Sequence, residues 1–168
     1  MSKVLIPVDG SSNSTKAVRH VVNQFMSNHR LEVHLLNVRT PLSQHIARFL
    51  SRGTRMQFHR DEAEKALVPA REMLSRFGVP YTEHVELGAK AETITRVAQE
   101  LGAAQIVMGT ARKNSFTRLV EDSVTNRVLE LTSVPVEVVA GEGVSTLERF
   151  GVPAGVAAAI ALLVVAVD

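Results

Sequence analysis

The chain has no cysteine and no tryptophan, and only 4% of its 168 residues are aromatic. The absence of cysteine excludes disulfides and thiolate metal sites, and it is compatible with a reducing compartment. The scarcity of aromatic rings removes the stacking platform on which single-stranded nucleic acids bind. The net charge of +2 gives only a weak global field. We therefore expect no nucleic-acid partner.

Signals for export and for catalysis are also missing. The N-terminal stretch MSKVLIPVDG has too short an apolar run for a secretory signal, so we expect the globular part to stay in the cytoplasm. The chain contains neither the Gly-x-Ser-x-Gly elbow of serine hydrolases nor the His-Glu-x-x-His pair of zinc proteases. We expect no efficient enzyme and no metal site. The chain has six histidines, at positions His20, His29, His34, His45, His59 and His84, and we expect most of them to lie at the surface.

What the chain does contain is a regular alternation of apolar strands and amphipathic helices, with 45% apolar residues. The expected strands cover residues 4–8, 32–38, 81–85, 106–108 and 136–139. Four helices are expected: one that starts from the SSNS stretch at 11–14 and carries apolar positions up to Phe25, one over 61–77 with a kink at Pro69, one over 92–101, and one capped by Asp122 or Ser123. This order predicts one α/β domain with a doubly wound, five-stranded parallel sheet and a ligand crevice at the carboxyl ends of the strands.

Apolar residues at helical spacing should face the core. They are Ala17, Val18, Val21, Val22 and Phe25 in the first helix, Ala63, Ala66, Leu67, Ala70, Met73, Leu74 and Phe77 in the second, and Ile94, Val97, Ala98 and Leu101 in the third.

The stretch from Ile106 to Val128 is the main candidate for a ligand site. It runs as a strand, a turn at Gly109, a polar loop and a helix start, where free backbone N–H groups and the helix dipole favour an anion. At the same edge of the sheet, Asp9-Gly10-Ser11-Ser12 could bind metal or phosphate. The same residues would also serve as a turn and a helix cap, and this second interpretation is the commoner one.

The last strand should lie at an edge of the sheet, because it is short, follows a proline and ends the alternation. An unpaired edge invites a second chain, so we expect a homodimer. The residues of this dimer strand are Val136, Glu137, Val138 and Val139.

Taken together, these pieces resemble the universal stress protein family over about residues 1–140. The resemblance is carried by VLIPVDGSSNSTKAV at the start, LLNV at the end of the second strand, and IVMGT with SVTNRVLELTSVPVEVV near the close. It implies a five-stranded parallel sheet of the adenine nucleotide alpha hydrolase-like type and a homodimer through the last strand. It also implies a role in stress response and, in one branch, ATP binding.

The ATP-binding branch of that family is marked by Gly-x2-Gly-x9-Gly-(Ser/Thr). On this chain, Gly109, Arg112, Asp122 and Ser123 stand at the four marked positions, so two of three glycines are replaced. By the same resemblance, Asp9 would meet the ribose or a metal such as Mg²⁺. Adenine would lie at Val38, the ribose side at Met108 and Gly109, and the phosphates at Ser123, Val124 and Thr125, with Pro7 and Val8 completing the set.

The two replacements bear on whether a nucleotide binds. A carboxylate at Asp122, ~4 Å from a phosphate at an effective dielectric near 20, would cost about 4 kcal/mol, or roughly a thousandfold in affinity. Arg112 could bind phosphate directly, or it could pair with Asp122 and fill the pocket, and we favour the second. One hypothesis is therefore a dimeric stress-response domain that acts through unknown protein partners without tight ATP binding. The other is a switch that binds ATP or AMP with Mg²⁺, or a slow ATPase.

Residues 39–60 hold five arginines, two histidines and no acid. Leu42, Ile46, Phe49 and Leu50 would share one face of a short helix there, so the segment could be a basic amphipathic element near anionic lipid. The interpretation we favour is a mobile, solvated lid over the crevice.

The polar linker 141–149 leads into residues 150–168, which carry no charge until Asp168. As a helix from Phe150 this run would extend ~27 Å, against a hydrocarbon core of ~30 Å. Exposed in water it would be an aggregation hazard, so something must cover it. The alternatives are a bilayer, which would attach the domain to the inner face of the membrane, a partner subunit, and the domain's own surface.

Overall fold

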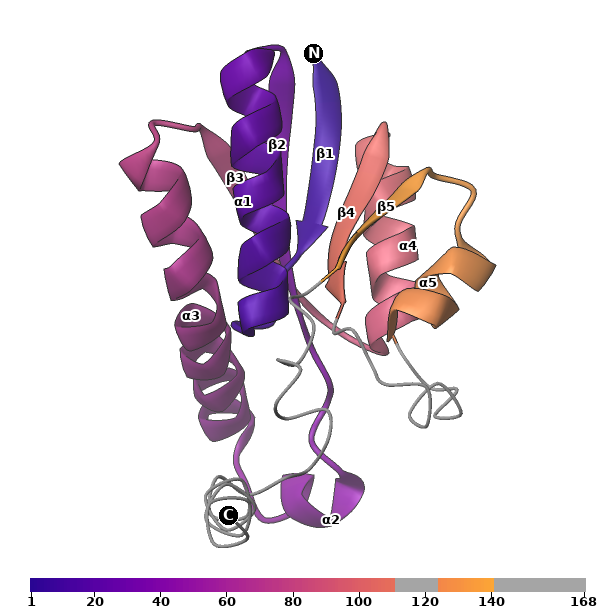
Figure 1. The fold of residues 1–168 in the computed structure, drawn as a ribbon. Coiled ribbons are helices and arrows are strands. Elements are labelled where there is room, and N and C mark those ends of the chain that lie inside the picture. Colours follow the sequence, from indigo (N-terminus) through magenta and orange to yellow (C-terminus); the bar gives the residue numbers. More distant parts are fainter. Residues whose placement is uncertain (111–123, 141–168) are drawn as a thin grey trace, which may run out of the picture.

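The computed structural model describes residues 1–110 and 124–140, and Figure 1 shows their arrangement. The elements are β1 (Ser2–Pro7), α1 (Ser12–Ser27), β2 (Leu31–Arg39), α2 (Gln44–Ala47), α3 (Arg52–Arg76), β3 (Tyr81–Leu87), α4 (Lys90–Leu101), β4 (Gln105–Thr110), α5 (Val124–Leu131) and β5 (Val136–Ala140). The predicted cap at Asp122 or Ser123, the linker 141–149 and the apolar segment 150–168 lie outside the described residues.

The five strands form one sheet in the order β3-β2-β1-β4-β5, and every neighbouring pair is parallel. The chain winds outward from β1 to β3 and then returns to add β4 and β5 on the other side. This is the doubly wound sheet that the alternation predicted, and it places β5 at an edge. The carboxyl ends of β1 and β4 meet at the point where the winding reverses, which is where such sheets bind ligands.

Helices cover both faces of the sheet (Figure 1). Helices α1 and α3 pack on one face, around Val18, Val22 and Leu67, while α4 and α5 pack on the other, around Ile94 and Val128. Because both faces are covered, the middle of the central strand β1 is an uninterrupted apolar run, in which Val4, Leu5 and Ile6 are fully buried. The inward faces predicted from helical spacing are confirmed for α1. In α3, Phe77 is an exception, because it is the exposed C-terminal cap residue of the helix.

The main difference from the predicted boundaries is that α3 begins at Arg52 instead of Asp61. Ser51 caps this early start, since its hydroxyl accepts a hydrogen bond from the Thr54 amide at 3.1 Å. The helix continues through Pro69 to Arg76. Strand β3 extends to Leu87, two residues beyond the prediction, and α4 starts at Lys90, two residues before it.

None of the helices in the described part of the chain combines the length and the apolar character that a membrane crossing requires.

Candidate functional site

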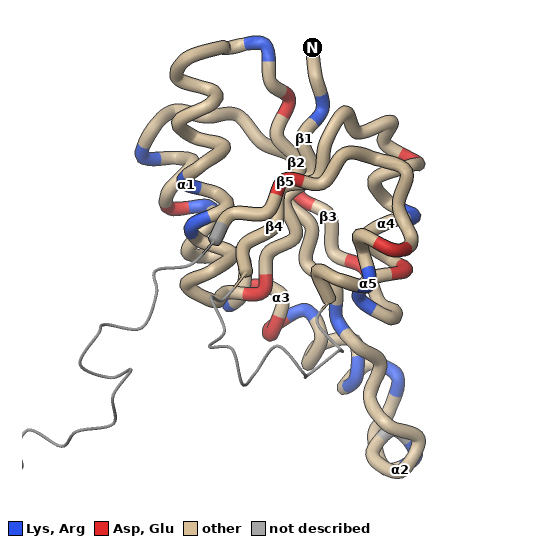
Figure 2. The backbone as a smooth tube through the Cα atoms, turned by 45° about the vertical axis from the view of Figure 1, so that its right-hand side comes forward, with Lys and Arg blue, Asp and Glu red and all other residues tan. Residues whose placement is uncertain are grey.

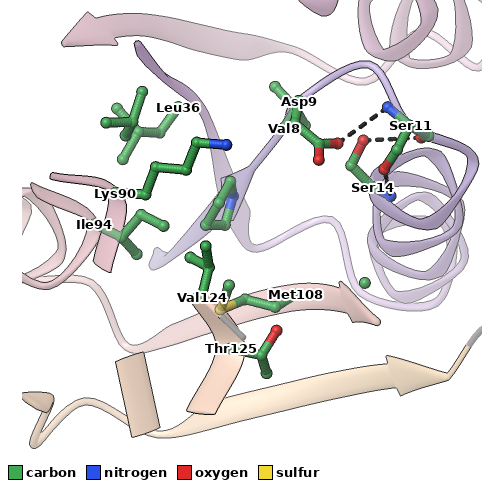
Figure 3. Close-up of a pocket in the computed structure, with 13 residues that line it drawn as sticks. Val8, Asp9, Ser11, Ser14, Leu36, Lys90, Ile94, Met108, Val124 and Thr125 are labelled. Atoms are coloured by element: carbon green, nitrogen blue, oxygen red, sulfur yellow. Dashed lines mark hydrogen bonds between the residues drawn. The ribbon is translucent and has the colours of Figure 1, made fainter. Parts of the chain in front are cut away.

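A pocket opens at the carboxyl edge of the sheet, where the strand ends meet the first turns of α1, α4 and α5 (Figure 3). Its cavity volume, as bounded by the described residues, is about 120 Å³. The described residues that line it are Pro7, Val8, Asp9, Ser11, Ser14, Leu36, Val38, Lys90, Ile94, Met108, Gly109, Val124 and Thr125.

The turn after β1 holds Asp9 in a defined position. The Ser11 amide donates a hydrogen bond to Oδ1 of Asp9 at 3.0 Å, and Ser11 is also the N-cap of α1, accepting from the Ser14 amide at 3.2 Å. The Ser14 hydroxyl donates to the Ser11 carbonyl oxygen at 2.9 Å. Gly10 makes the turn possible with a φ of 81°. Turn, cap and candidate ligand contact are thus built from the same few residues.

The Asp9 carboxyl is held in its charged form. Burial by itself would raise its pKa, but the interactions with Ser11 and Ser14 and the positive charge of Lys90 together lower the pKa below the ordinary value of 3.8. Asp9 is therefore a carboxylate at neutral pH, and it can accept hydrogen bonds from hydroxyl groups or bind a cation.

Lys90 lies on the opposite wall of the pocket and extends toward Asp9 (Figure 3). It is the first residue of α4, whose N-cap Ala89 has no side-chain hydrogen bond to offer. A cation at the N-terminal end of a helix opposes the helix dipole, so the charge of Lys90 does not stabilise α4. Its ammonium group can donate hydrogen bonds to an anion in the pocket.

Between these two charges the wall is apolar. Leu36 and Val38 from β2, Ile94 from α4 and Met108 from β4 are buried and belong to the core cluster of the α4 face. The pocket thus combines a slot for a flat apolar group with a carboxylate on one side and an ammonium group on the other. This combination suits an organic molecule that carries both hydroxyl and anionic groups.

Gly109 is required by packing at the pocket wall. A Cβ atom added there would lie 1.9 Å from the carbonyl oxygen of Asn13 in α1, which no real structure tolerates. The glycine lets β4 and the start of α1 approach closely, and this role does not depend on a ligand.

The structure brings eight of the ten predicted site residues together around the pocket: Pro7, Val8, Asp9, Val38, Met108, Gly109, Val124 and Thr125. The other two, Arg112 and Ser123, and the replaced motif residue Asp122 lie outside the described residues. The prediction did not include Ser14, Leu36, Lys90 and Ile94 as pocket residues. Lys90 could have been found from its position just after a strand end, had the prediction continued β3 to Leu87.

The basic segment does not cover this pocket. No residue between 40 and 60 is among its described lining residues, so the structure does not place the segment over the crevice as a lid.

Two of the six histidines are exceptions to the expected surface position: His34 and His59 are only 4% and 9% exposed. Nδ1 of His34 lies 3.0 Å from Nε2 of His84 on the neighbouring strand, and its Nε2 lies 3.1 Å from Oε1 of Glu32. Burial and the nearby His34 lower the pKa of His84. The contact between His34 and His84 joins residues fifty positions apart, so spacing along the chain did not reveal it. Within residues 1–110 and 124–140, no group of three or more metal-ligating side chains is placed to hold an ion.

Comparison with known proteins identifies the family. The sequence pattern of the Universal stress protein family matches residues 1–140. Universal stress protein MJ0531 of Methanocaldococcus jannaschii is 31% identical to this chain over 140 residues, which cover 82% of this chain and 81% of that protein. Universal stress protein G of Shigella flexneri is 31% identical over 145 residues, covering 81% and 96% respectively. The chain belongs to the universal stress protein family, which confirms the resemblance found in its sequence.

Solved structures share the fold. The hypothetical protein MJ0577 matches with a TM-score of 0.67 at 25% identity, over 85% of this chain and 98% of that one. A universal stress protein family protein from Arabidopsis thaliana with AMP bound has a TM-score of 0.61 at 15% identity, over 87% and 96%. The universal stress protein from Archaeoglobus fulgidus in complex with dAMP has a TM-score of 0.59 at 19% identity, over 82% and 96%.

Proposed function

We propose that this chain is a stress-response protein that acts by association with other proteins, and that its pocket binds an adenine nucleotide of the AMP type as a regulatory ligand. The observation that supports an adenine nucleotide as the ligand is the apolar slot between Asp9 and Lys90. Adenine would fill the slot, a ribose hydroxyl would donate to the Asp9 carboxylate, and a single phosphate would accept from Lys90. Two structural neighbours were solved with AMP and dAMP, which are ligands of this chemistry.

A triphosphate is a poorer fit for this chain than a monophosphate. Two of the three glycines of the family's ATP motif are replaced, by Arg112 and Asp122. A carboxylate near the outer phosphates repels them, whereas a single phosphate held at Lys90 does not need the missing glycines. We therefore expect neither tight ATP binding nor ATP turnover.

Titration calorimetry on the full chain tests the ligand, with AMP and with ATP plus Mg²⁺ injected separately. We expect measurable AMP binding and no gain in affinity for ATP. Lys90→Gln should weaken AMP binding about tenfold, because it removes a charge-assisted hydrogen bond. Lys65→Gln is the matched control, since Lys65 is exposed on α3 and is not among the lining residues of the pocket.

Two results would contradict this part of the proposal. One is ATP with Mg²⁺ binding much more tightly than AMP, with phosphate release in a coupled assay, which would identify the ATP switch or slow ATPase. The other is equal AMP affinity in the Lys90→Gln and unmodified proteins.

The first protein association in this proposal is a homodimer, in which β5 of one chain pairs with β5 of a second. The strand lies at the edge of the sheet, and Val138 is 40% exposed on it. Glu137 points the other way and is tied to α1 by Gln24 and His20, at 3.0 and 2.7 Å. The strand therefore has a fixed face toward its own domain, and no other described strand pairs with its outer edge, which would be open to a second chain.

Light scattering after size-exclusion chromatography tests the dimer. Val138→Lys should raise the dissociation constant at least about tenfold, because two lysines would meet across a twofold interface. Val85→Lys on β3, the opposite edge strand, is the control, since Val85 is also exposed. A monomeric unmodified protein, or equal effects of the two substitutions, would contradict the dimer.

A further inference from the structure

The first two turns of α3 project beyond the end of the sheet. Ala70, Ala63 and Met56 follow one another at seven-residue spacing and so lie on the same stripe of the helix. Ala70 and Ala63 are 3% and 2% exposed, whereas Met56 is 71% exposed. The core-facing stripe of α3 thus continues into a region where the described residues do not cover it.

Helix α2 and the link to α3 add to this projection. Phe49 is 80% exposed and Ile46 is 52% exposed, although both are large apolar side chains. The guanidinium carbon of Arg48 lies 5.4 Å from the centre of the Phe49 ring. We call residues 43–60 the arginine lobe. Figure 2 shows it extending away from the body of the domain.

The arginine lobe is the cationic pole of the molecule. It contains Arg48, Arg52, Arg55 and Arg60 and no Asp or Glu, which leaves 15 Lys and Arg against 17 Asp and Glu in the rest of the chain. Within the part of the chain that the structure describes, none of these four arginines forms a salt bridge; Arg60 has only a longer-range interaction with Glu64. Exposed apolar groups and unpaired positive charge therefore coincide at one tip.

We propose that the arginine lobe docks on an anionic lipid surface. Phe49, Ile46 and Met56 would enter the boundary between head groups and acyl chains, and the arginines would bind the lipid phosphates. The lobe projects as a convex tip, and the cavities beside Asp9 and beside Gln24 include no lobe residue among their described walls. The exposed apolar side chains beside the arginines favour a lipid surface, which accepts both the charges and the apolar groups, over an acidic peptide, which would pair with the arginines alone.

The remainder of the chain points to the same partner. Residues 150–167 are uncharged, so this segment cannot neutralise the arginines by covering the lobe. A single short apolar segment gives only marginal membrane attachment, and a neighbouring cationic patch supplies the second signal that stable attachment needs. The lobe and the apolar segment would act together, one through charge and the other through apolar area.

Vesicle co-sedimentation of the full chain tests the proposal. We expect binding to vesicles of phosphatidylcholine with 30% phosphatidylglycerol to exceed binding to pure phosphatidylcholine, and to weaken as salt is added. Arg48→Gln, Arg52→Gln and Arg60→Gln together should lower binding to the anionic vesicles by on the order of 100-fold, at about fivefold for each arginine. Binding to the neutral vesicles should not change.

The matched control replaces Arg19, Arg30 and Arg76 by glutamine, because these arginines are exposed outside the lobe. It removes the same net charge and should preserve binding to the anionic vesicles. An equal loss in both triple variants would mean that only total charge matters, and would overturn the proposal. Retained anionic preference in the lobe variant would also overturn it.

Because the chain lacks cysteine, a single introduced thiol can report on contact with lipid. Met56→Cys labelled with an environment-sensitive fluorophore should shift to the blue with anionic vesicles, while Met26→Cys on α1, also exposed, should not. A Met56→Cys signal that is already blue-shifted without vesicles would show the lobe covered by protein and overturn the proposal. Binding of soluble polyglutamate without binding of anionic vesicles would identify an acidic protein partner instead.

Discussion

Replacing Gly109 by alanine should disrupt the packing between β4 and the start of α1. The added Cβ atom would lie 1.9 Å from the oxygen and 2.3 Å from the carbon of the Asn13 carbonyl group, whereas ordinary contacts begin at 3.4 Å. The first turn of α1 would therefore have to move away by about 1.5 Å. The clash is with backbone, which cannot rotate away as a side chain would. Overpacking costs about 1–3 kcal/mol, and we expect at least the upper end of that range.

Urea unfolding followed by circular dichroism, at one fixed protein concentration, measures this effect. Gly53→Ala in the first turn of α3 is the control, because a Cβ atom there meets only the Ser51 hydroxyl, at 3.7 Å. That control should gain up to about 1 kcal/mol, since alanine restricts the unfolded chain and favours helix. A Gly109→Ala protein within about 0.5 kcal/mol of the unmodified chain would refute the packing argument.

Three further substitutions test the α1 cap, the core and the histidine pair. Ser11→Ala should lower the free energy of unfolding by about 1 kcal/mol, because it removes the N-cap of α1; no change would mean that the capping bond contributes nothing. Leu67→Ala should cost about 2–5 kcal/mol, as expected for a leucine that is 1% exposed; a loss below 1 kcal/mol would contradict its place in the core. Since the pKa of His84 is lowered from 6.5 in the folded chain, the unfolded chain binds more protons as the pH falls. The contribution of His84 to the free energy of unfolding should therefore be at its full value above pH 6.5 and decrease as the pH falls below 6.5 and through the lower pKa of the folded state. His84→Gln should flatten this decrease in urea titrations between pH 7 and 5, and an unchanged slope would exclude His84 as its source.

The sheet could be predicted because its interior strands are buried on both faces. Val4, Leu5 and Ile6 are all fully buried, so the sequence shows a continuous apolar run followed by a turn. The edge strand β3 was harder to delimit. Its end at Leu87 is set by backbone pairing with Arg39, while the Leu87 side chain is 53% exposed and gives no clear pattern. That shortened prediction is also the reason Lys90 was not recognised at the pocket.

The start of α3 and the buried histidines were not predictable for a different reason. From Arg52 onward α3 has no buried residue before His59, so helical periodicity is missing there, and the capping bond of Ser51 determines where the helix begins. His34 is buried next to His84, fifty positions further along the chain, and only the register of β2 and β3 brings the two together. The histidine contact is long-range and is not encoded in local sequence, whereas the start of α3 depends on a single local cap without a periodic apolar pattern behind it.

The hydrogen bond that the Ser11 amide donates to Asp9 means that this side chain is already ordered before a ligand arrives. Immobilising a free side chain on binding costs about 0.5–1.5 kcal/mol of rotamer entropy. For Asp9 this entropy is already lost when the turn folds, so ligand binding does not incur it again. The Ser11 amide occupies one acceptor position on Oδ1, and the carboxylate retains further acceptor positions for a ligand hydroxyl. Folding of the turn thus preorganises the recognition of a ligand.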